Sequence, residues 1–242
     1  MMALTSEAHQ MPDNLGVAQI RGMFFAHTLA DSAGCAATGQ ELSQWGQQWW
    51  AARRGLPVLS TYNQKWADYL QGALPRSIVR GPLIEDFPIL QTVLDDPLWP
   101  LLNRLVHPQE DTSCWAAQLR LNGRPLRYFS VRRLERLCGL PRWCGLCGVL
   151  GLLGSERSAD QFARAWLRTV FADYVLCVAS TLPAKMDCSF LYRILDEAHR
   201  LGKFGDVAGW PSTCAQFERK LRRLDRIRKR LTTRGWINEE GD

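Results

Sequence analysis

The sequence predicts a mainly α protein, multi-helical with one inserted β-hairpin. Three observations support this. Large apolar residues recur every three or four positions in most segments, prolines divide the first hundred residues into short pieces, and one segment alternates apolar and polar residues. The chain has 242 residues, of which 46% are hydrophobic and 22% charged. The chain is therefore long and apolar enough to form a substantial core, and its composition is not that of a disordered chain.

Short helices are expected in the first hundred residues. Over 40–54 the large apolar side chains Leu42, Trp45 and Trp49 follow helical spacing. Further helices are expected over 62–70, 90–94 and 98–106, separated by Pro88, Pro97, Pro100 and Pro108.

The β signal lies in the middle of the chain. From 115 to 121 the residues alternate, which predicts a strand with Trp115, Ala117, Leu119 and Leu121 on one face. Asn122 and Gly123 follow, and this dipeptide accepts the positive φ of a type I′ turn. A second strand is therefore expected over 124–131.

Three capped helices are expected in the C-terminal third. Ser158 and Gln161 have capping-box spacing and predict a helix to about Ala179, with Phe162, Trp166, Val170, Tyr174 and Val178 at i+4 steps. Asp187 is the expected cap of a helix over 188–201 that ends at Gly202. Pro211 and Ser212 precede a third helix over 213–234, closed by Gly235, whose apolar stripe is Phe217, Leu221, Leu224, Ile227 and Leu231.

Positive charge is concentrated in that last helix. The chain carries a formal charge of +6, and residues 218–234 hold nine basic and two acidic side chains. The rest of the chain is therefore close to neutral. We predict that this helix binds nucleic acid through Arg219, Lys220, Arg222, Arg223, Arg226, Arg228, Lys229, Arg230 and Arg234. A protein partner with an acidic surface, or a solvated helix with no special role, are the alternatives.

A second basic patch is expected on and after the hairpin. Its predicted nucleic-acid-binding residues are Arg120, Arg124, Arg127, Arg132 and Arg133. Tyr128 and Phe129 lie among them, and aromatic rings between arginines are typical of surfaces on which unpaired bases stack.

The C-terminal third resembles a known DNA-binding family. A helix, a capped helix and a long basic helix precede Arg234, Gly235, Trp236 and Ile237. Over about 159–238 this order is similar to the helix-turn-helix core of winged-helix proteins, which include plasmid replication initiators and transcription regulators. The resemblance implies that the basic helix is the recognition helix and that the Gly-aromatic step leads into the first strand of the wing.

Eight cysteines are scattered along the chain, and reduced thiols are expected for them. Cys138, Cys144 and Cys147 include a C-x2-C pair, which is half of a zinc site, but no second pair follows at fixed spacing. Buried core thiols are the preferred interpretation, with neither metal nor cofactor expected. The apolar run over 145–154 is about half the length of a membrane span, and no good signal peptide is visible, so a cytoplasmic protein without membrane contact is predicted.

No enzymatic activity is predicted. The histidines His9, His27, His107 and His199 have no spacing typical of metal or nucleophile chemistry, and there is no phosphate-binding glycine loop. Three acidic pairs, Glu85–Asp86, Asp95–Asp96 and Glu110–Asp111, leave a magnesium-dependent nuclease as a further alternative.

The sequence as a whole predicts three modules and one function. Residues 1–110 form a Trp-rich helical module for a protein partner or for homo-oligomerisation, 111–154 a hairpin and Cys-rich connector, and 155–242 a basic nucleic-acid-binding module. The predicted function is non-enzymatic binding of duplex DNA, as a regulator or replication-type factor. The alternative is a structural subunit of a ribonucleoprotein complex that binds RNA or another single-stranded nucleic acid.

Overall fold

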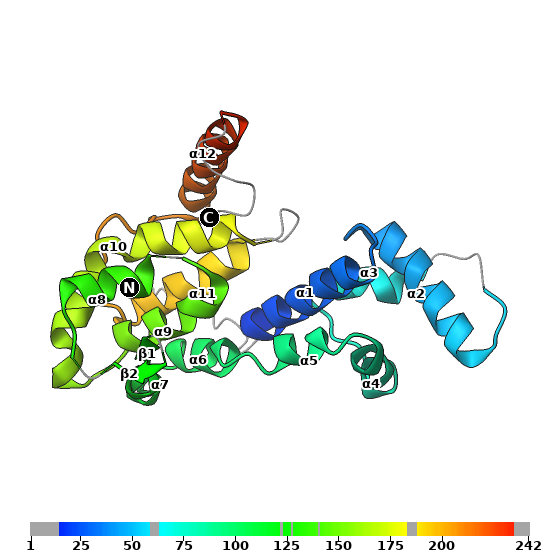
Figure 1. Ribbon diagram of the computed structural model, residues 1–242, viewed down its shortest axis with the longest axis horizontal. Helices are drawn as coiled ribbons and strands as arrows, with labels where there is room; N and C mark the ends of the chain where they lie inside the picture. Colours follow the sequence, from blue (N-terminus) through cyan, green and yellow to red (C-terminus); the bar gives the residue numbers. More distant parts are fainter. Residues whose placement is uncertain are drawn as a thin grey trace, which may run out of the picture.

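The protein is mainly α-helical, with one small antiparallel sheet, as the sequence predicts. The computed structural model describes residues 15–58, 63–121, 123–126, 128–139, 141–182 and 188–234. Figure 1 shows an elongated molecule in which α1–α5 occupy one end and α6–α11 the other, with α12 projecting from the second part. The helices are α1 (Leu15–Ser32), α2 (Gly39–Arg54), α3 (Gln64–Leu70), α4 (Ser77–Asp86), α5 (Ile89–Leu94), α6 (Leu98–Leu105), α7 (Ser113–Gln118), α8 (Val131–Cys138), α9 (Trp143–Leu153), α10 (Gln161–Ser180), α11 (Ser189–Arg200) and α12 (Cys214–Thr233). None of the helices in the described ranges is long and apolar enough to cross a membrane.

Helix α1 belongs to both parts of the molecule. Val17 and Ile20 lie in a hydrophobic cluster with α6 and α9–α12, whereas Phe25 and Leu29 lie in a second cluster with α2–α5. A helix that is apolar on several sides must be covered on several sides, which explains why this one joins two cores.

Local sequence signals set the ends of α2. The Thr38 side chain accepts a hydrogen bond from the backbone N–H of Glu41, and Gly55 closes the helix with a φ of 63°. Within α2, Gly46 allows close packing, because a Cβ atom there would lie 2.2 Å from the Trp66 ring of α3. Trp66 also makes edge contacts with Trp45 and Trp49, so the tryptophans at this end form one aromatic cluster.

The first strand predicted from the alternation is largely wrong. Residues 113–118 form α7, and its Ala116 is buried while Trp115 packs beside Gly151 of α9. Among the described residues, only β1 (Arg120–Leu121) and β2 (Arg124–Pro125) pair as strands, with Leu121 opposite Arg124. Gly123 turns the chain with a φ of 75°, as expected for the hairpin, whereas Asn122 lies outside the described residues. The second strand, predicted over 124–131, ends at Pro125, and Val131 already begins α8 (Val131–Cys138).

The helix predicted after Ser158 is present, but its predicted i+4 row is buried only toward the end of the helix, at Tyr174 and Val178. Ser158–Asp160 form a 3-10 turn and α10 begins at Gln161. Phe162 is 51% exposed, while the neighbouring Ala163 and Leu167 are fully buried. Strict i+4 steps advance 40° further than a full turn, so five such residues spread over about 160° and cannot share one face.

The remaining two helices lie close to their predicted bounds. Helix α11 covers Ser189–Arg200, and Gly202 follows with a φ of 78°. Helix α12 is continuous over Cys214–Thr233. The predicted cap Asp187 and the closing residues Gly235, Trp236 and Ile237 lie outside the described residues.

Candidate nucleic-acid interface

The basic helix α12 begins at a well-formed cap. Thr213 accepts a hydrogen bond from the backbone N–H of Gln216, and the side-chain oxygen of Gln216 accepts one from the backbone N–H of Ser212 at 2.7 Å. These reciprocal bonds satisfy backbone groups that the first turn leaves without helical partners. These bonds therefore give the helix that carries the basic residues a defined start at Thr213.

An aromatic stack anchors the start of α12 to the body. Phe217 is 1% exposed, and its ring lies on Tyr192 of α11 with centroids 5.2 Å apart. Tyr192 in turn stacks on Trp210, and Trp210 stacks on Phe171 of α10, with ring planes 6° apart. Leu221 and Leu224 are half-buried against the same core.

The outer half of α12 leaves the body, which corrects one prediction. The sequence predicts that Phe217, Leu221, Leu224 and Leu231 are buried, but only Phe217 is fully buried and the three leucines are half-buried. Ile227 of the same stripe is 43% exposed. Beyond Leu224, Arg228 also contacts the body, since its guanidinium donates to the Ser180 carbonyl at the end of α10. Because α10 ends there, it does not continue beside the outer half of α12, which stands out from the described body in Figure 1.

Most of the predicted basic residues of α12 are exposed. The exposed ones are Arg219, Arg222, Arg223, Arg226, Lys229, Arg230 and Arg234, while Lys220 and Arg228 are half-buried. Lys220 donates to the Gly209 carbonyl and Arg228 to Ser180, so these two side chains attach the helix to the body. Arg222 pairs with Glu218 at 3.4 Å. Within the described part of the chain, Arg219, Arg223, Lys229 and Arg230 form no ion pair or hydrogen bond through their side chains.

Several of these side chains line one open hollow. Arg219, Arg222, Asp225, Arg226 and Lys229 surround a volume of about 610 Å³. Four positive groups and one carboxylate on adjacent turns favour an anion over a cation in this hollow. The four basic residues are three or four positions apart, so their charged groups lie along one side of the helix. A row of phosphates would require such an arrangement.

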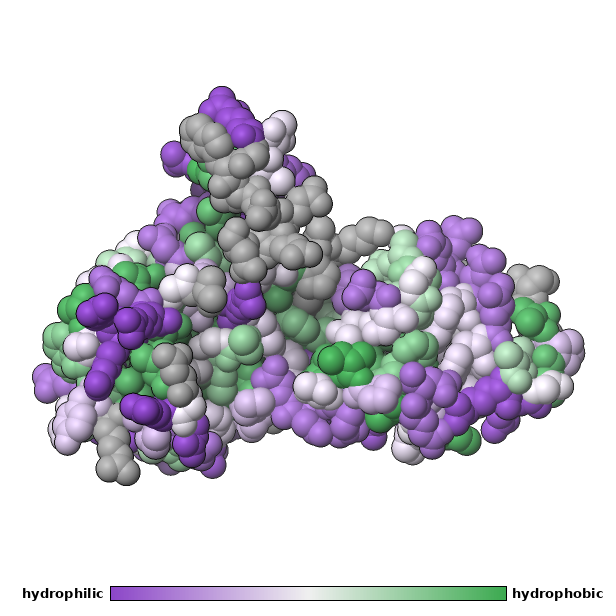
Figure 2. Space-filling view, viewed as in Figure 1, coloured by the Kyte–Doolittle hydropathy of each residue, from purple (hydrophilic) through white to green (hydrophobic). Residues whose placement is uncertain are grey.

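The second predicted patch is formed by the hairpin and α8. Arg120, Arg124, Arg132 and Arg133 are exposed, and Arg127 lies outside the described residues. Figure 2 shows hydrophilic residues over α8 and over the outer part of α12. Both α8 and α12 pack against α10, which is thus the common support of the two basic elements.

Tyr128 is the most exposed aromatic ring of this second patch. It is 77% exposed, and its backbone carbonyl accepts a hydrogen bond from Arg133 at 3.0 Å. Phe129, by contrast, packs against the core. Of the two predicted stacking residues, only Tyr128 therefore presents its ring to solvent.

Cys138, Cys144 and Cys147 do not form a group of three potential metal ligands in the described part of the chain. No group of three or more His, Cys, Asp or Glu side chains gathers at metal-binding distance anywhere in the described ranges. Burial raises the pKa of Cys138 to about 11, and burial together with the Asp96 charge raises the pKa of Cys147 to about 12. Burial therefore favours the protonated thiol form of both residues.

The three acidic pairs are each used in structural contacts. Arg53 pairs with both Glu85 and Asp86. Asp95 accepts a hydrogen bond from Gln91 at 2.7 Å, and Asp96 accepts one from the Trp143 indole at 2.9 Å. Glu110 pairs with Arg104 at 3.0 Å, and Asp111 caps the start of α7.

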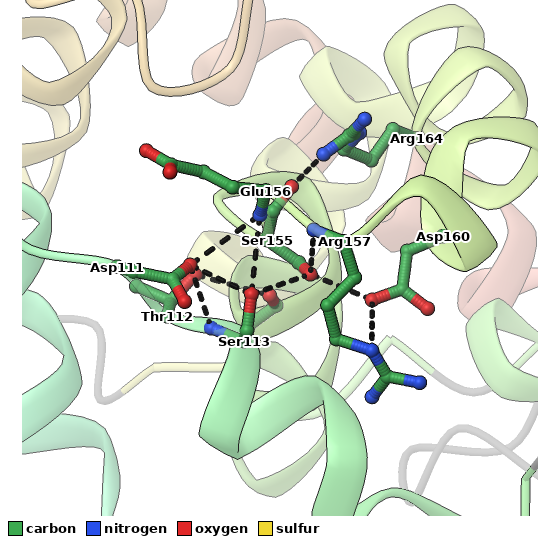
Figure 3. Close-up of polar contacts among 9 residues, drawn as sticks. Asp111, Thr112, Ser113, Ser155, Glu156, Arg157, Asp160 and Arg164 are labelled. Atoms are coloured by element: carbon green, nitrogen blue, oxygen red, sulfur yellow. Dashed lines mark hydrogen bonds and ion pairs between the residues drawn. The ribbon is translucent and has the colours of Figure 1, made fainter.

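A buried polar network was not predicted from the sequence. Figure 3 shows Asp111, Ser113, Ser155 and Asp160 joined in one chain of hydrogen bonds. Ser155 donates to Asp160 at 2.6 Å, and the backbone N–H of Glu156 donates to both Asp111 and Ser113. The network connects the start of α7, the end of α9 and the start of α10. Its only local sequence signal is the Asp111-x-Ser113 cap, because the partners are 42 residues further along the chain.

Network residues at the α10 end add positive charge. Arg157 lies 3.6 Å from Asp160, and Arg164 donates to the backbone carbonyl of Ser155. These contacts hold carboxylate and carbonyl oxygens in place, and no histidine or cysteine lies among the residues in Figure 3. The arrangement is that of a joint between helices.

Comparisons with known proteins return no relative of this chain. No protein-family model matches it, and neither a curated protein nor a solved structure matches it.

Proposed function

We propose that this protein binds nucleic acid without catalysis, with duplex DNA as the preferred partner and α12 as its principal contact. The observation that supports this most directly is that α12 packs on the body through its first half, while its outer half projects and its basic side chains are mostly exposed. Phe217 attaches the helix to the body, while Arg219, Arg223, Lys229 and Arg230 have no protein counter-charge in the described residues. Such a row of cations is stabilised by an external polyanion.

Duplex DNA suits the dimensions of the helix. The 20 residues of α12 span about 30 Å, and the major groove is about 12 Å wide, enough to admit one α-helix. Because the outer half stands away from the body, it can enter the groove before the body meets the backbone. In this proposal most arginines contact phosphates, and two or three of them contact base edges.

The biological role follows from the resemblance to winged-helix proteins. As a regulator or replication-type factor in the cytoplasm, the protein would use α12 as its recognition helix. The N-terminal half, with its aromatic cluster around Trp66, would bind a protein partner or a second copy of the chain.

A second candidate rests on Tyr128. An aromatic ring that is 77% exposed between arginines suits stacking on an unpaired base. This favours RNA or single-stranded DNA, as in a subunit of a ribonucleoprotein complex. Preference between duplex and single strand separates the two candidates, whereas dependence on salt does not, because both partners carry phosphates.

The test measures binding of the full chain to duplex DNA, single-stranded DNA and RNA over a salt series. Changing Arg222, Arg223, Arg226 and Arg230 to Gln should make the slope of log K against log salt shallower by about 3 to 4 units for a duplex, since each phosphate contact contributes about 0.9. Changing Arg120, Arg124, Arg132 and Arg133 to Gln is the matched control and should alter the duplex slope less. A folded quadruple α12 variant that binds all three partners as tightly as the parent would refute the role of α12.

A further inference from the structure

We propose that a hollow where α1, α5, α6 and α9 meet binds a small organic cation with an apolar body. The hollow has a volume of about 290 Å³, and its walls include Phe24, Ile89, Val93, Asp96, Trp143 and Leu182. Its walls come from helices that Figure 1 places at the junction between the two parts of the elongated molecule, and from Thr181 and Leu182 just after α10. None of its lining residues is among the proposed nucleic-acid contacts, so this inference goes beyond the proposed function.

Aromatic rings form one wall of the hollow. Phe24 and Trp143 lie with centroids 4.1 Å apart and planes tilted by 36°. Trp99 supports both rings from the core, at 5.6 Å from Phe24 and 5.4 Å from Trp143, and is only 4% exposed. Phe24 and Trp143 are half-buried, so part of each ring remains accessible. The faces of such rings attract a cation placed within about 6 Å of the centroid.

Asp96 provides the charge that selects the ligand. It is the only charged residue among the described residues that line the hollow, and none of the described lysines or arginines forms an ion pair with it. Its Oδ1 accepts a hydrogen bond from the Leu98 backbone N–H at 2.8 Å, and its Oδ2 accepts one from Trp143 at 2.9 Å. Each carboxylate oxygen has a second acceptor position, so both remain able to bind a cation or an N–H donor.

The other walls define the rest of the ligand. Ile89, Val93 and Leu182 offer apolar surface, while the hydroxyl-bearing residues Thr92 and Thr181 are exposed at the mouth. A volume of about 290 Å³ lies at the lower end for small-molecule sites, which start near 300 Å³. The combination of aromatic faces, one carboxylate and apolar walls favours an alkylammonium or similar amine, and disfavours an anion.

Choline and 3,3-dimethylbutan-1-ol form a matched pair of probes, because they share a shape and differ in charge. In titration calorimetry with the full chain, choline should bind roughly tenfold more tightly than the neutral alcohol. Equal affinities, or no detectable heat from choline at millimolar concentration, would overturn the proposal.

Two variants locate the site. Asp96→Asn should lower choline affinity roughly tenfold and leave binding of the alcohol unchanged. Because Asp96 also caps α6, a second variant protects the test: Thr92→Trp places a bulky ring at the exposed mouth and should abolish binding of both probes while the circular dichroism spectrum stays that of the parent. Gln161→Trp, at an exposed position on α10 outside the lining, is the control and should bind like the parent. Parental choline binding by a folded Thr92→Trp variant would show that the cation does not occupy this hollow.

Discussion

Phe217 of α12 lies on the ring of Tyr192 of α11, with their centroids 5.2 Å apart and their planes inclined by 29°. The Tyr192 hydroxyl donates a hydrogen bond to the Pro211 carbonyl at 2.8 Å, just before α12 begins. One tyrosine therefore fixes both the entry of the chain into the basic helix and the first apolar residue of its stripe. The direction in which the exposed arginines point depends on this contact.

Replacing Phe217 should destabilise the fold strongly. Phe217→Ala leaves a cavity beside Tyr192. Replacing a buried phenylalanine by alanine lowers the free energy of unfolding by about 3–5 kcal/mol. Ile227→Ala, on the exposed part of the same helix, should change it by about 0.5 kcal/mol or less. Urea unfolding followed by circular dichroism measures both. Equal effects of the two substitutions would contradict the docked and projecting halves described for α12.

Removing the Ser155 hydroxyl should also weaken the fold. Ser155→Ala deprives the buried Asp160 carboxylate of its 2.6 Å hydrogen bond, and a buried acceptor left without its donor costs about 1–3 kcal/mol. Ser158→Ala, at an exposed position one turn away, is the control and should be nearly silent in the same urea experiment. A Ser155→Ala variant as stable as the parent would mean that the network does not hold α7, α9 and α10 together.

Alkaline pH should lower stability through two buried thiols. In the folded chain Cys138 keeps its proton to a pKa of about 11 and Cys147 to about 12, whereas the ordinary value is 9.0. A raised folded pKa contributes stability that is complete below pH 9 and is lost as pH rises toward 12, because the unfolded thiols ionise first. The free energy of unfolding should therefore fall between about pH 9 and pH 12, and should fall less in a variant with both Cys138→Ala and Cys147→Ala. Cys114→Ala removes an exposed thiol and should keep the parental pH dependence.

Tyr128 gives a prediction for single-stranded partners. If its ring stacks on a base, Tyr128→Ala should cost about 1–3 kcal/mol of affinity for single-stranded RNA or DNA and leave duplex binding close to that of the parent. Tyr128→Phe retains the ring and should bind like the parent. Fluorescence anisotropy with labelled oligonucleotides at fixed salt measures all three. An unchanged single-strand affinity for Tyr128→Ala would remove the support for the ribonucleoprotein candidate.

The sequence by itself determined the fold class and many of the helix ends. Helices α2, α5, α6 and α12 begin and end within a few residues of their predicted bounds. The signals for these ends are local. The Thr213 side chain caps α12 by accepting a hydrogen bond from the backbone N–H of Gln216, and Gly55 closes α2. The concentration of charge on α12 is equally a property of the sequence, so the candidate interface on that helix could be named without a structure.

Tertiary structure alone decided which faces are covered. The alternating residues near Trp115 form a helix because Ala116 and its neighbours pack against α9, and this contact outweighs a local pattern typical of a strand. Ile227 and Leu231 belong to the same apolar stripe as Phe217, but Leu231 is half-buried and Ile227 is exposed. The reason is that α10 ends at Ser180 and α11 lies beside the start of α12. The hollow beside Trp143 and the network around Ser155 likewise join residues far apart in the chain. The ends of a helix are set by contacts between residues within about four positions of each other, so the sequence predicts them. Which side chains of the helix are buried depends on where other helices end, and the spacing of apolar residues within the helix does not determine this.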